Sequence, residues 1–167
     1  MIEFNKQAKL EFGYSPQKVL DAIQQKLKLL QKRYTKAYEL ILSDLAKENI
    51  FILNETQLDK TQGNFVKKYF QENVRLEIFP IMLDKDASIY LAIRFSKNKS
   101  KEIHYALIEV PTSALSRFVV LPSKKEKQFI LFLDDVIRYN LTSIFQIYDI
   151  DKIEAYTIKF TRDAELD

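Results

Sequence analysis

A long stretch without glycine or an internal proline constrains this chain more than any other feature. It starts after Ser15, a good N-cap residue, places Pro16 at the first helical position, and continues to Glu48. Its apolar residues recur at alternating spacings of three and four, which is the heptad pattern of a helix that packs along one seam. The members of this seam are Leu20, Ile23, Leu27, Leu30, Tyr34, Ala37 and Ile41.

The length and width of this seam predict contacts beyond a simple helix pair. A helix over 16–48 would reach about 50 Å, at about 1.5 Å per residue. Further apolar residues widen the seam, so we expect the helix to pack on more than one neighbour. They are Val19, Tyr38, Leu42 and Leu45. The helix is therefore interpreted as the arm of a helical hairpin or as an oligomer contact, and either is compatible with a helix that bridges two domains of a larger protein.

The rest of the chain predicts short strands, most of them adjacent in sequence, and two helices. The helices are expected over 58–74 and 134–147, with Asp59 and Asp134 as candidate caps. The strands are expected at 50–53, 78–83, 88–95, 103–110, 117–122, 127–133 and 156–161. This order favours an α+β fold, in which a long N-terminal helix precedes an antiparallel or mixed sheet with one or two covering helices.

Two of the predicted elements, the helix over 58–74 and the closing strand, have a candidate buried side. In the helix over 58–74, Phe65, Tyr69 and Phe70 form the expected buried stripe. In the closing strand, Tyr156, Ile158 and Phe160 alternate with polar residues, as the buried side chains of a half-buried strand do.

The composition excludes several classes of function. The chain of 167 residues has no Cys, a single His and only two Gly. Disulfides, thiolate zinc sites and Cys nucleophiles are therefore excluded, and neither kind of Gly-rich phosphate loop can be built. The net charge of +3 is too small to indicate a nucleic-acid-binding protein.

No apolar run approaches the roughly 20 residues of a membrane span, and the polar residues near Met1 do not fit a signal peptide. A cytoplasm-like compartment is the default expectation.

The few candidate chemical groups each have a structural interpretation. His104 lies in an expected strand with no triad-like partners, which favours a surface or edge-strand histidine over a ligand or an acid–base group. Asp134 and Asp135 resemble a catalytic pair, but helix starts favour acids for capping and for the helix dipole. The lysines in the turns 96–101 and 123–128 are typical of solvated charges, although on one face they would attract a polyanion.

The end of the chain concentrates charge after the closing strand. Arg162 follows this strand, with Asp163 and Glu165 close behind. A structural ion pair is the favoured interpretation of Arg162, and a clamp for a substrate anion is the alternative. Residue patterns alone assign no catalytic, cofactor-binding or metal-binding residue, and they predict a domain without an active site of its own.

Several stretches in a fixed order resemble a known family. "RFVVLP" at 117–122, "DDVIRYNL" at 134–141 and "TRDAE" at 161–165 are the most specific of them. Together they resemble polyphosphate kinase of the long-chain-synthesising type, which transfers the terminal phosphate of ATP to polyphosphate. The resemblance extends from about Tyr14 to Asp167. The family usually has a longer loop where Asp84–Ala87 stand here.

The resemblance implies an enzyme of four units: an N-terminal helical domain, a head domain, and two C-terminal domains related to phospholipase D. Residues 1–48 would be the end of the helical domain, and 49–167 the first part of the head (middle) domain, which would continue past Asp167. In the family, the phosphorylated catalytic His and the residues for magnesium and most nucleotide contacts lie in the C-terminal units. His104 therefore inherits no catalytic role, and ATP and magnesium are expected only of the longer enzyme.

These implications give one main functional hypothesis and two alternatives. The chain is expected to be a non-catalytic fragment that makes subunit contacts and partly walls the polyphosphate channel, with Arg162 as a possible channel residue. Its expected partners are the remaining enzyme domains, polyphosphate and copies of itself, without nucleic acid. The expected location is the cytoplasm or the membrane periphery. A stand-alone scaffolding or polyanion-binding module is one alternative, and a hydrolase using Asp134, Asp135 or Asp163 is the weakest.

Overall fold

The computed structural model describes residues 15–78, 88–97, 102–148 and 150–159. The chain divides into two units, Met1–Glu48 and Asn49–Asp167. In the described part, no helix has both the length and the apolar character that a membrane crossing requires.

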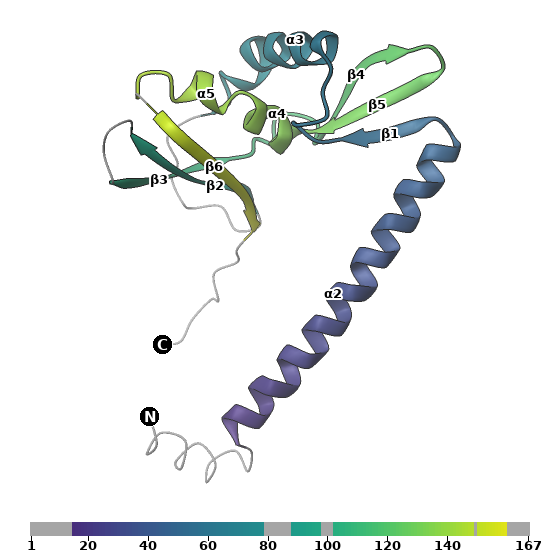
Figure 1. Ribbon diagram of the computed structural model, residues 1–167, viewed down its shortest axis with the longest axis vertical. Helices are drawn as coiled ribbons and strands as arrows, with labels where there is room; N and C mark the ends of the chain where they lie inside the picture. Colours follow the sequence, from purple (N-terminus) through teal and green to yellow (C-terminus); the bar gives the residue numbers. More distant parts are fainter. Residues whose placement is uncertain (1–14, 79–87, 98–101, 149, 160–167) are drawn as a thin grey trace. The chain divides into compact units, whose positions relative to one another are not determined.

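Helix α2 (Pro16–Lys47) is one uninterrupted helix, as the sequence predicts (Figure 1). Ser15 occupies the N-cap position and Pro16 the first turn, although the Ser15 side chain makes no capping hydrogen bond. The helix ends at Lys47, and Asn49, two residues further on, has a left-handed φ of 60°. Asn tolerates this conformation better than most residues and often follows the end of a helix.

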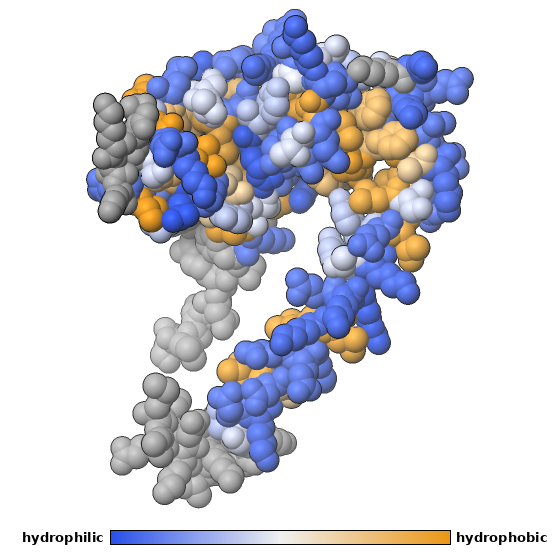
Figure 2. All heavy atoms as spheres, viewed as in Figure 1, coloured by the Kyte–Doolittle hydropathy of each residue, from blue (hydrophilic) through white to orange (hydrophobic). Residues whose placement is uncertain are grey.

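The seam of α2 is exposed. Leu27 is 56% exposed, Leu30 63% and Tyr34 70%, and no residue of the helix is buried. Figure 2 shows apolar residues along this helix among hydrophilic ones.

The second unit contains a mixed sheet, which we call the first sheet. It is built from β1 (Ile50–Leu53), β5 (Lys127–Phe132) and β4 (Phe118–Lys124), in that order. β5 lies in the middle, parallel to β1 and antiparallel to β4. A parallel pair joins strands far apart in the sequence, so all the chain from Asn54 to Glu126 is inserted between β1 and β5.

An antiparallel sheet, which we call the second sheet, has the order β3 (Ile103–Glu109), β2 (Ile89–Lys97) and β6 (Ile150–Lys159). β2 is central and pairs with both neighbours along nearly its whole length. The two sheets with their helices confirm the predicted α+β class. The strand predicted at 78–83 lies almost entirely outside the described residues, as does the loop Asp84–Ala87.

The inward side of β6 differs from the prediction. Tyr156 and Ile158 are 59% and 36% exposed, whereas Ile153 and Ala155 pack against the core. The register explains the reversal: Ala155 pairs with Ile93 and Thr157 with Leu91, and both β2 residues are fully buried or nearly so. Paired residues share a face of the sheet, so Thr157 lies on the same face as Leu91, although its own side chain is exposed.

Helix α3 (Lys60–Tyr69) starts at the predicted cap. The Asp59 side chain accepts hydrogen bonds from the backbone N–H groups of Thr61 and Gln62, at 2.9 and 3.0 Å. Gln62 Oε1 in turn accepts from the N–H of Asp59, which completes a capping box. The helix continues as a wider π-helical turn, η1 (Phe70–Val74). The buried stripe is Val66, Phe70 and Val74, while the predicted Phe65 and Tyr69 are only half-buried beside it.

The helix predicted over 134–147 is two short helices, α4 (Leu133–Tyr139) and α5 (Leu141–Ile144). Asn140 separates them, and its side-chain amide donates to the carbonyl of Val136 at 2.8 Å. Such a bond competes with the helical backbone pattern. The prediction that Asp134 caps the helix is wrong, because Phe132 occupies the N-cap and Asp134 lies in the first turn.

The core of the second unit joins both sheets through the helices. Val66 and Phe70 from the α3–η1 segment pack with Val136 and Ile137 from α4 in one cluster. The same cluster contains β2, β3, β4 and β5 residues, which are Leu91, Ile93, Phe95, Ile108, Val119, Leu121 and Leu131. Helices α3 and α4 therefore hold the two sheets together.

Gly63 permits the close approach of α3 to α4. A Cβ atom added at Gly63 would overlap Tyr139 Oη and would lie 3.1 Å from Tyr139 Cζ. We expect Gly63→Ala to lower the free energy of unfolding by about 1–3 kcal/mol through overpacking. The roughly 1 kcal/mol that Ala normally gains over Gly inside a helix offsets part of this cost. Thermal unfolding followed by circular dichroism measures the change.

The control for this prediction is a double-mutant cycle with Tyr139→Phe, which removes only the hydroxyl. The destabilisation by Gly63→Ala should be smaller in the Tyr139→Phe background, because the worst overlap is gone. Equal or raised stability of Gly63→Ala in the wild-type background would contradict the packing argument.

Candidate functional site

The acidic pair at the start of α4 is buried. Asp134 is 8% exposed and Asp135 7%. Their neighbours Leu133, Val136 and Ile137 are completely buried, so the first turn of α4 enters the core directly after β5. Ionised carboxylates in such surroundings need partners, because desolvation without pairing is costly.

Arg138 and Thr157 supply these partners. Arg138 Nη1 contacts Asp135 Oδ1 directly, and Arg138 Nη2 donates to Thr157 Oγ1 at 2.7 Å. The Thr157 hydroxyl then donates to Asp134 Oδ2 at 2.9 Å. Glu55, in the turn after β1, lies 3.8 Å from Arg138 Nη1. We call these five residues the α4 polar network; it links α4 to β6 and to the end of β1.

Burial raises the pKa of Asp135 from its ordinary value of 3.8 to about 7. Repulsion from Asp134 and Glu55 acts in the same direction, while the Arg138 guanidinium acts against it. The network therefore holds a proton near neutral pH that an exposed aspartate would have lost.

The contacts of the α4 polar network are those of a structural ion-pair network. Among the described residues, no group of three His, Cys, Asp or Glu side chains could hold a metal ion. Both carboxylates are directed at Arg138 and Thr157. Asp163, the third acid of the hydrolase hypothesis, lies outside the described residues, as do Arg162 and Glu165.

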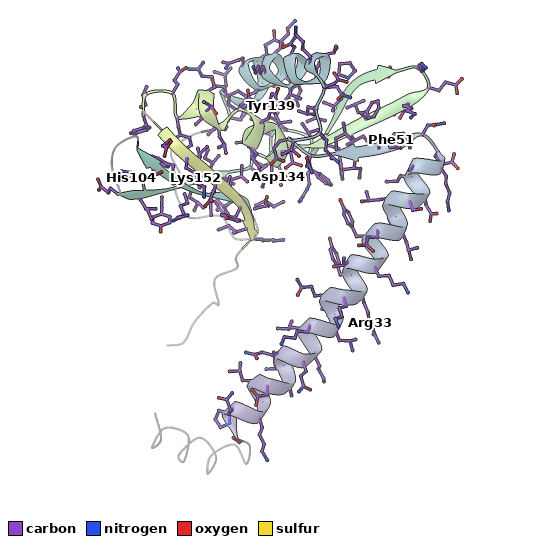
Figure 3. All side chains as sticks on the ribbon, in the orientation of Figure 1. Arg33, Phe51, His104, Asp134, Tyr139 and Lys152 are labelled. Carbon is purple, nitrogen blue, oxygen red and sulfur yellow. The ribbon has the colours of Figure 1, made fainter. Side chains whose placement is uncertain are left out.

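His104 lies apart from the network, as Figure 3 shows for His104 and Asp134. It belongs to β3, an edge strand of the second sheet. Its ring stacks on Phe95 with centroids 5.3 Å apart, and its Nε2 lies 3.8 Å from Glu102 Oε2. This agrees with an edge-strand histidine.

The turn lysines are only partly described, because residues 98–101 lie outside the described part. Lys127 is the first residue of β5, directly after the turn, and its Nζ lies 5.2 Å from the centroid of the Phe51 ring. That distance is typical of a cation–π contact, so this lysine also packs on the first sheet.

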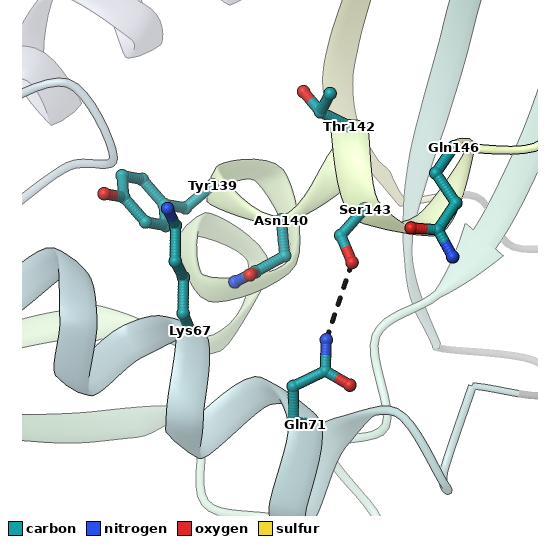
Figure 4. A pocket seen from close by; sticks show the side chains of 7 residues that line it. All are labelled: Lys67, Gln71, Tyr139, Asn140, Thr142, Ser143 and Gln146. Atoms are coloured by element: carbon teal, nitrogen blue, oxygen red, sulfur yellow. Dashed lines mark hydrogen bonds between the residues drawn. The ribbon is translucent and has the colours of Figure 1, made fainter.

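A polar groove lies where α3 and η1 face α4 and α5 (Figure 4). Its volume is about 590 Å³, within the range of small-molecule sites. Lys67 and Gln71 line it from one side, and Asn140, Thr142 and Ser143 from the other, with Tyr139 beside Lys67. Gln71 Nε2 and Ser143 Oγ are 3.5 Å apart across the groove.

A second hollow of about 280 Å³ shares Ser143 and Gln146 with the first. Arg75 and Phe70 belong to its lining. Arg75 Nη1 donates to Gln71 Oε1 at 2.9 Å, so one amide side chain is held by Arg75 at one end and directed at Ser143 at the other.

Sequence patterns gave no role to any groove residue, although Tyr139 and Asn140 lie in the quoted stretch at 134–141. Lys67 and Gln71 come from one predicted helix, and Thr142 and Ser143 from the other. No motif links them, because the groove depends on how the two helices pack and on the break at Asn140. The only available signal was Gly63, an unexpected residue in a helix interior.

The raised pKa of Asp135 predicts a specific pH dependence. Between about pH 4 and about pH 7 the folded chain retains a proton that the unfolded chain releases, so this group lowers stability as the pH rises. Asp135→Asn cannot titrate. The melting temperature of the variant minus that of the wild type should therefore increase from pH 4 to pH 7, as measured by thermal unfolding at several pH values.

The control variant is Asp151→Asn, which makes the same substitution at an exposed residue of β6 outside the α4 polar network. A constant difference between wild type and Asp135→Asn across this range would show that Asp135 titrates alike in both states.

Comparison with known proteins shows which family this chain resembles. The family model of the polyphosphate kinase middle domain matches residues 61–167. The polyphosphate kinase of Vibrio cholerae serotype O1 is 40% identical over 159 residues, which cover 89% of this chain and 23% of that protein. The polyphosphate kinase of Escherichia coli K12 is 33% identical over 161 residues, with the same shares covered.

A solved structure agrees with this comparison. The crystal structure of polyphosphate kinase from Porphyromonas gingivalis has a TM-score of 0.77 and 26% sequence identity, over 96% of this chain and 26% of that chain. The chain therefore spans about a quarter of the length of the proteins that it matches. Because the family model matches well over half of its residues, this chain belongs to the polyphosphate kinase family.

Proposed function

We propose that this chain is a non-catalytic part of an enzyme that transfers the terminal phosphate of ATP to polyphosphate. The observation that carries the proposal is the match of residues 61–167 to the middle domain, together with the 23% of each relative that the chain covers. Phosphoryl transfer needs cations and a positioned nucleophile around the transferred group. We assign the ATP and magnesium contacts, and the phosphorylated histidine, to parts of the enzyme outside this chain.

The proposed role of α2 is contact with a neighbouring subunit or domain. Its exposed seam supports this proposal, because a helix with an apolar stripe gains stability chiefly by packing that stripe against another element. We further propose that the enzyme is a homo-oligomer in the cytoplasm or at the membrane periphery.

The proposed role of the second unit is to wall part of the polyphosphate channel, with Arg162 as a residue that contacts the chain of phosphates. This part of the proposal rests on the family resemblance and on the position of Arg162 three residues after Lys159, the last residue of β6. A guanidinium there would suit phosphate oxygens by bidentate donation.

The first test is catalytic. The 167-residue chain incubated with magnesium and ATP labelled at the γ-phosphate should form no labelled polyphosphate and should not become labelled itself. The longer protein should do both under the same conditions. Stable label on His104, lost in a His104→Ala variant, would contradict the assignment of catalysis to other parts of the enzyme.

The second test concerns the seam of α2. Replacing Leu27 and Leu30 with Asp introduces two charges into the apolar stripe and should convert oligomers of the chain into monomers in static light scattering. Gln25→Asp together with Ser43→Asp is the matched control, since both residues lie on the opposite side of the helix by their spacing. The control should remain oligomeric. If the wild-type chain is already a monodisperse monomer, α2 does not mediate self-association.

A further inference from the structure

The described lining of the groove between α3–η1 and α4–α5 offers hydrogen-bond donors but no carboxylate. Lys67 contributes an ammonium group, and Thr142 and Ser143 contribute hydroxyls. Arg75 stands in the adjoining hollow. Among the described residues that line the two hollows, none is Asp or Glu. A divalent cation would need carboxylate oxygens, so this lining suits an anion instead.

The Gln71 side chain is held at both ends by hydrogen bonds. The Gln71 carbonyl oxygen accepts from Arg75, which turns its NH₂ group toward Ser143. Ser143 Oγ accepts from Gln71 and can then donate its own hydrogen into the groove. Asn140 is 4% exposed and is held by its bond to the Val136 carbonyl, so the wall beside Ser143 is fixed.

Lys67 differs from its neighbour in sequence. Lys68 lies 3.8 Å from Glu72, one turn further along the helix. Within the described part of the chain, Lys67 has no carboxylate partner and lies over the groove beside Tyr139, as Figure 4 shows. An ammonium group without a counter-ion at the mouth of a donor-lined hollow favours a bound oxyanion.

We propose that this groove binds a phosphoryl oxyanion, through Lys67, Gln71, Thr142 and Ser143, at a site separate from the α4 polar network. The ligand chemistry is that of linked phosphate groups, which a polyphosphate chain and the phosphate tail of a nucleotide share. Two linked hollows with a cation in each suit a ligand with more than one phosphate. The site does not depend on catalysis, so its failure and the failure of the proposed function are separate results.

Isothermal titration of the 167-residue chain with tripolyphosphate, at low ionic strength, tests the site. Saturable binding with one site is expected. Lys67→Gln should weaken it about tenfold, the loss of one charge-assisted hydrogen bond. Lys68→Gln removes the same charge from the next residue and should weaken binding less than twofold. Circular dichroism and melting temperature should be the same for both variants and the wild type.

The same variants and ligands also test where tripolyphosphate binds and whether the natural ligand is a phosphate chain or a nucleotide. In nuclear magnetic resonance, the amide signals of Thr142 and Ser143 should shift with tripolyphosphate in the wild type and in Lys68→Gln. Equal affinities for ATP and tripolyphosphate identify the phosphate chain as the ligand, and tighter binding of ATP identifies a nucleotide; both support the site. The proposal is overturned if tripolyphosphate shows no saturable binding, if both lysine variants weaken it alike, or if adenosine binds and tripolyphosphate does not.

Discussion

The Thr157 hydroxyl is the contact on which the arrangement of the second unit depends. It accepts from Arg138 and donates to Asp134, so it completes the pairing of two carboxylates that α4 carries into the core. The surrounding Leu133, Val136 and Ile137 gain stability only if α4 is buried, and that burial takes Asp134 and Asp135 with it. A buried acid that loses its partner is strongly destabilising, so the apolar packing of α4 requires β6 to stand where Thr157 can reach it. One polar side chain in the second sheet thus bonds to a helix that follows directly from the first sheet.

Local patterns predicted most of the elements in the described residues. The long helix, the cap at Asp59 and the strand predicted at 88–95 each depend on residues close in sequence, and the structure confirms them. The same reasoning gave the wrong inward side for β6. Tyr156 and Ile158 are the more apolar residues, but the register with β2 aligns Thr157 with the buried Leu91, and a long-range polar contact decides the side. Asp134 was misassigned for the same reason: capping is a local rule, whereas its actual partner is 23 residues away.

The candidate site was still harder to predict. The acids of the α4 polar network were noticed as a pair, but the raised pKa of Asp135 follows from its burial and from charged neighbours in α4 and in the turn after β1. The polar groove has no sequence motif, since its residues become neighbours only through the approach of α3 and α4 at Gly63 and the break at Asn140. Family resemblance supplied the identity of the chain, and it could not supply these contacts, because the quoted stretches carry no information on side-chain geometry.

The π-helical turn at Phe70–Val74 acts as a one-residue insertion in the helix. The backbone N–H of Arg75 bonds to the carbonyl of Phe70, five residues back, where an α-helix would bond four back. Because each residue of an α-helix advances the direction of its side chain by about 100°, one extra residue shifts the phase of everything that follows by about that angle. The turn lets Phe70 and Val74 both stay buried while Arg75 lines the second hollow. A homologue that lacked one residue here would keep its helix and its apolar stripe, yet would present a different side chain at this position.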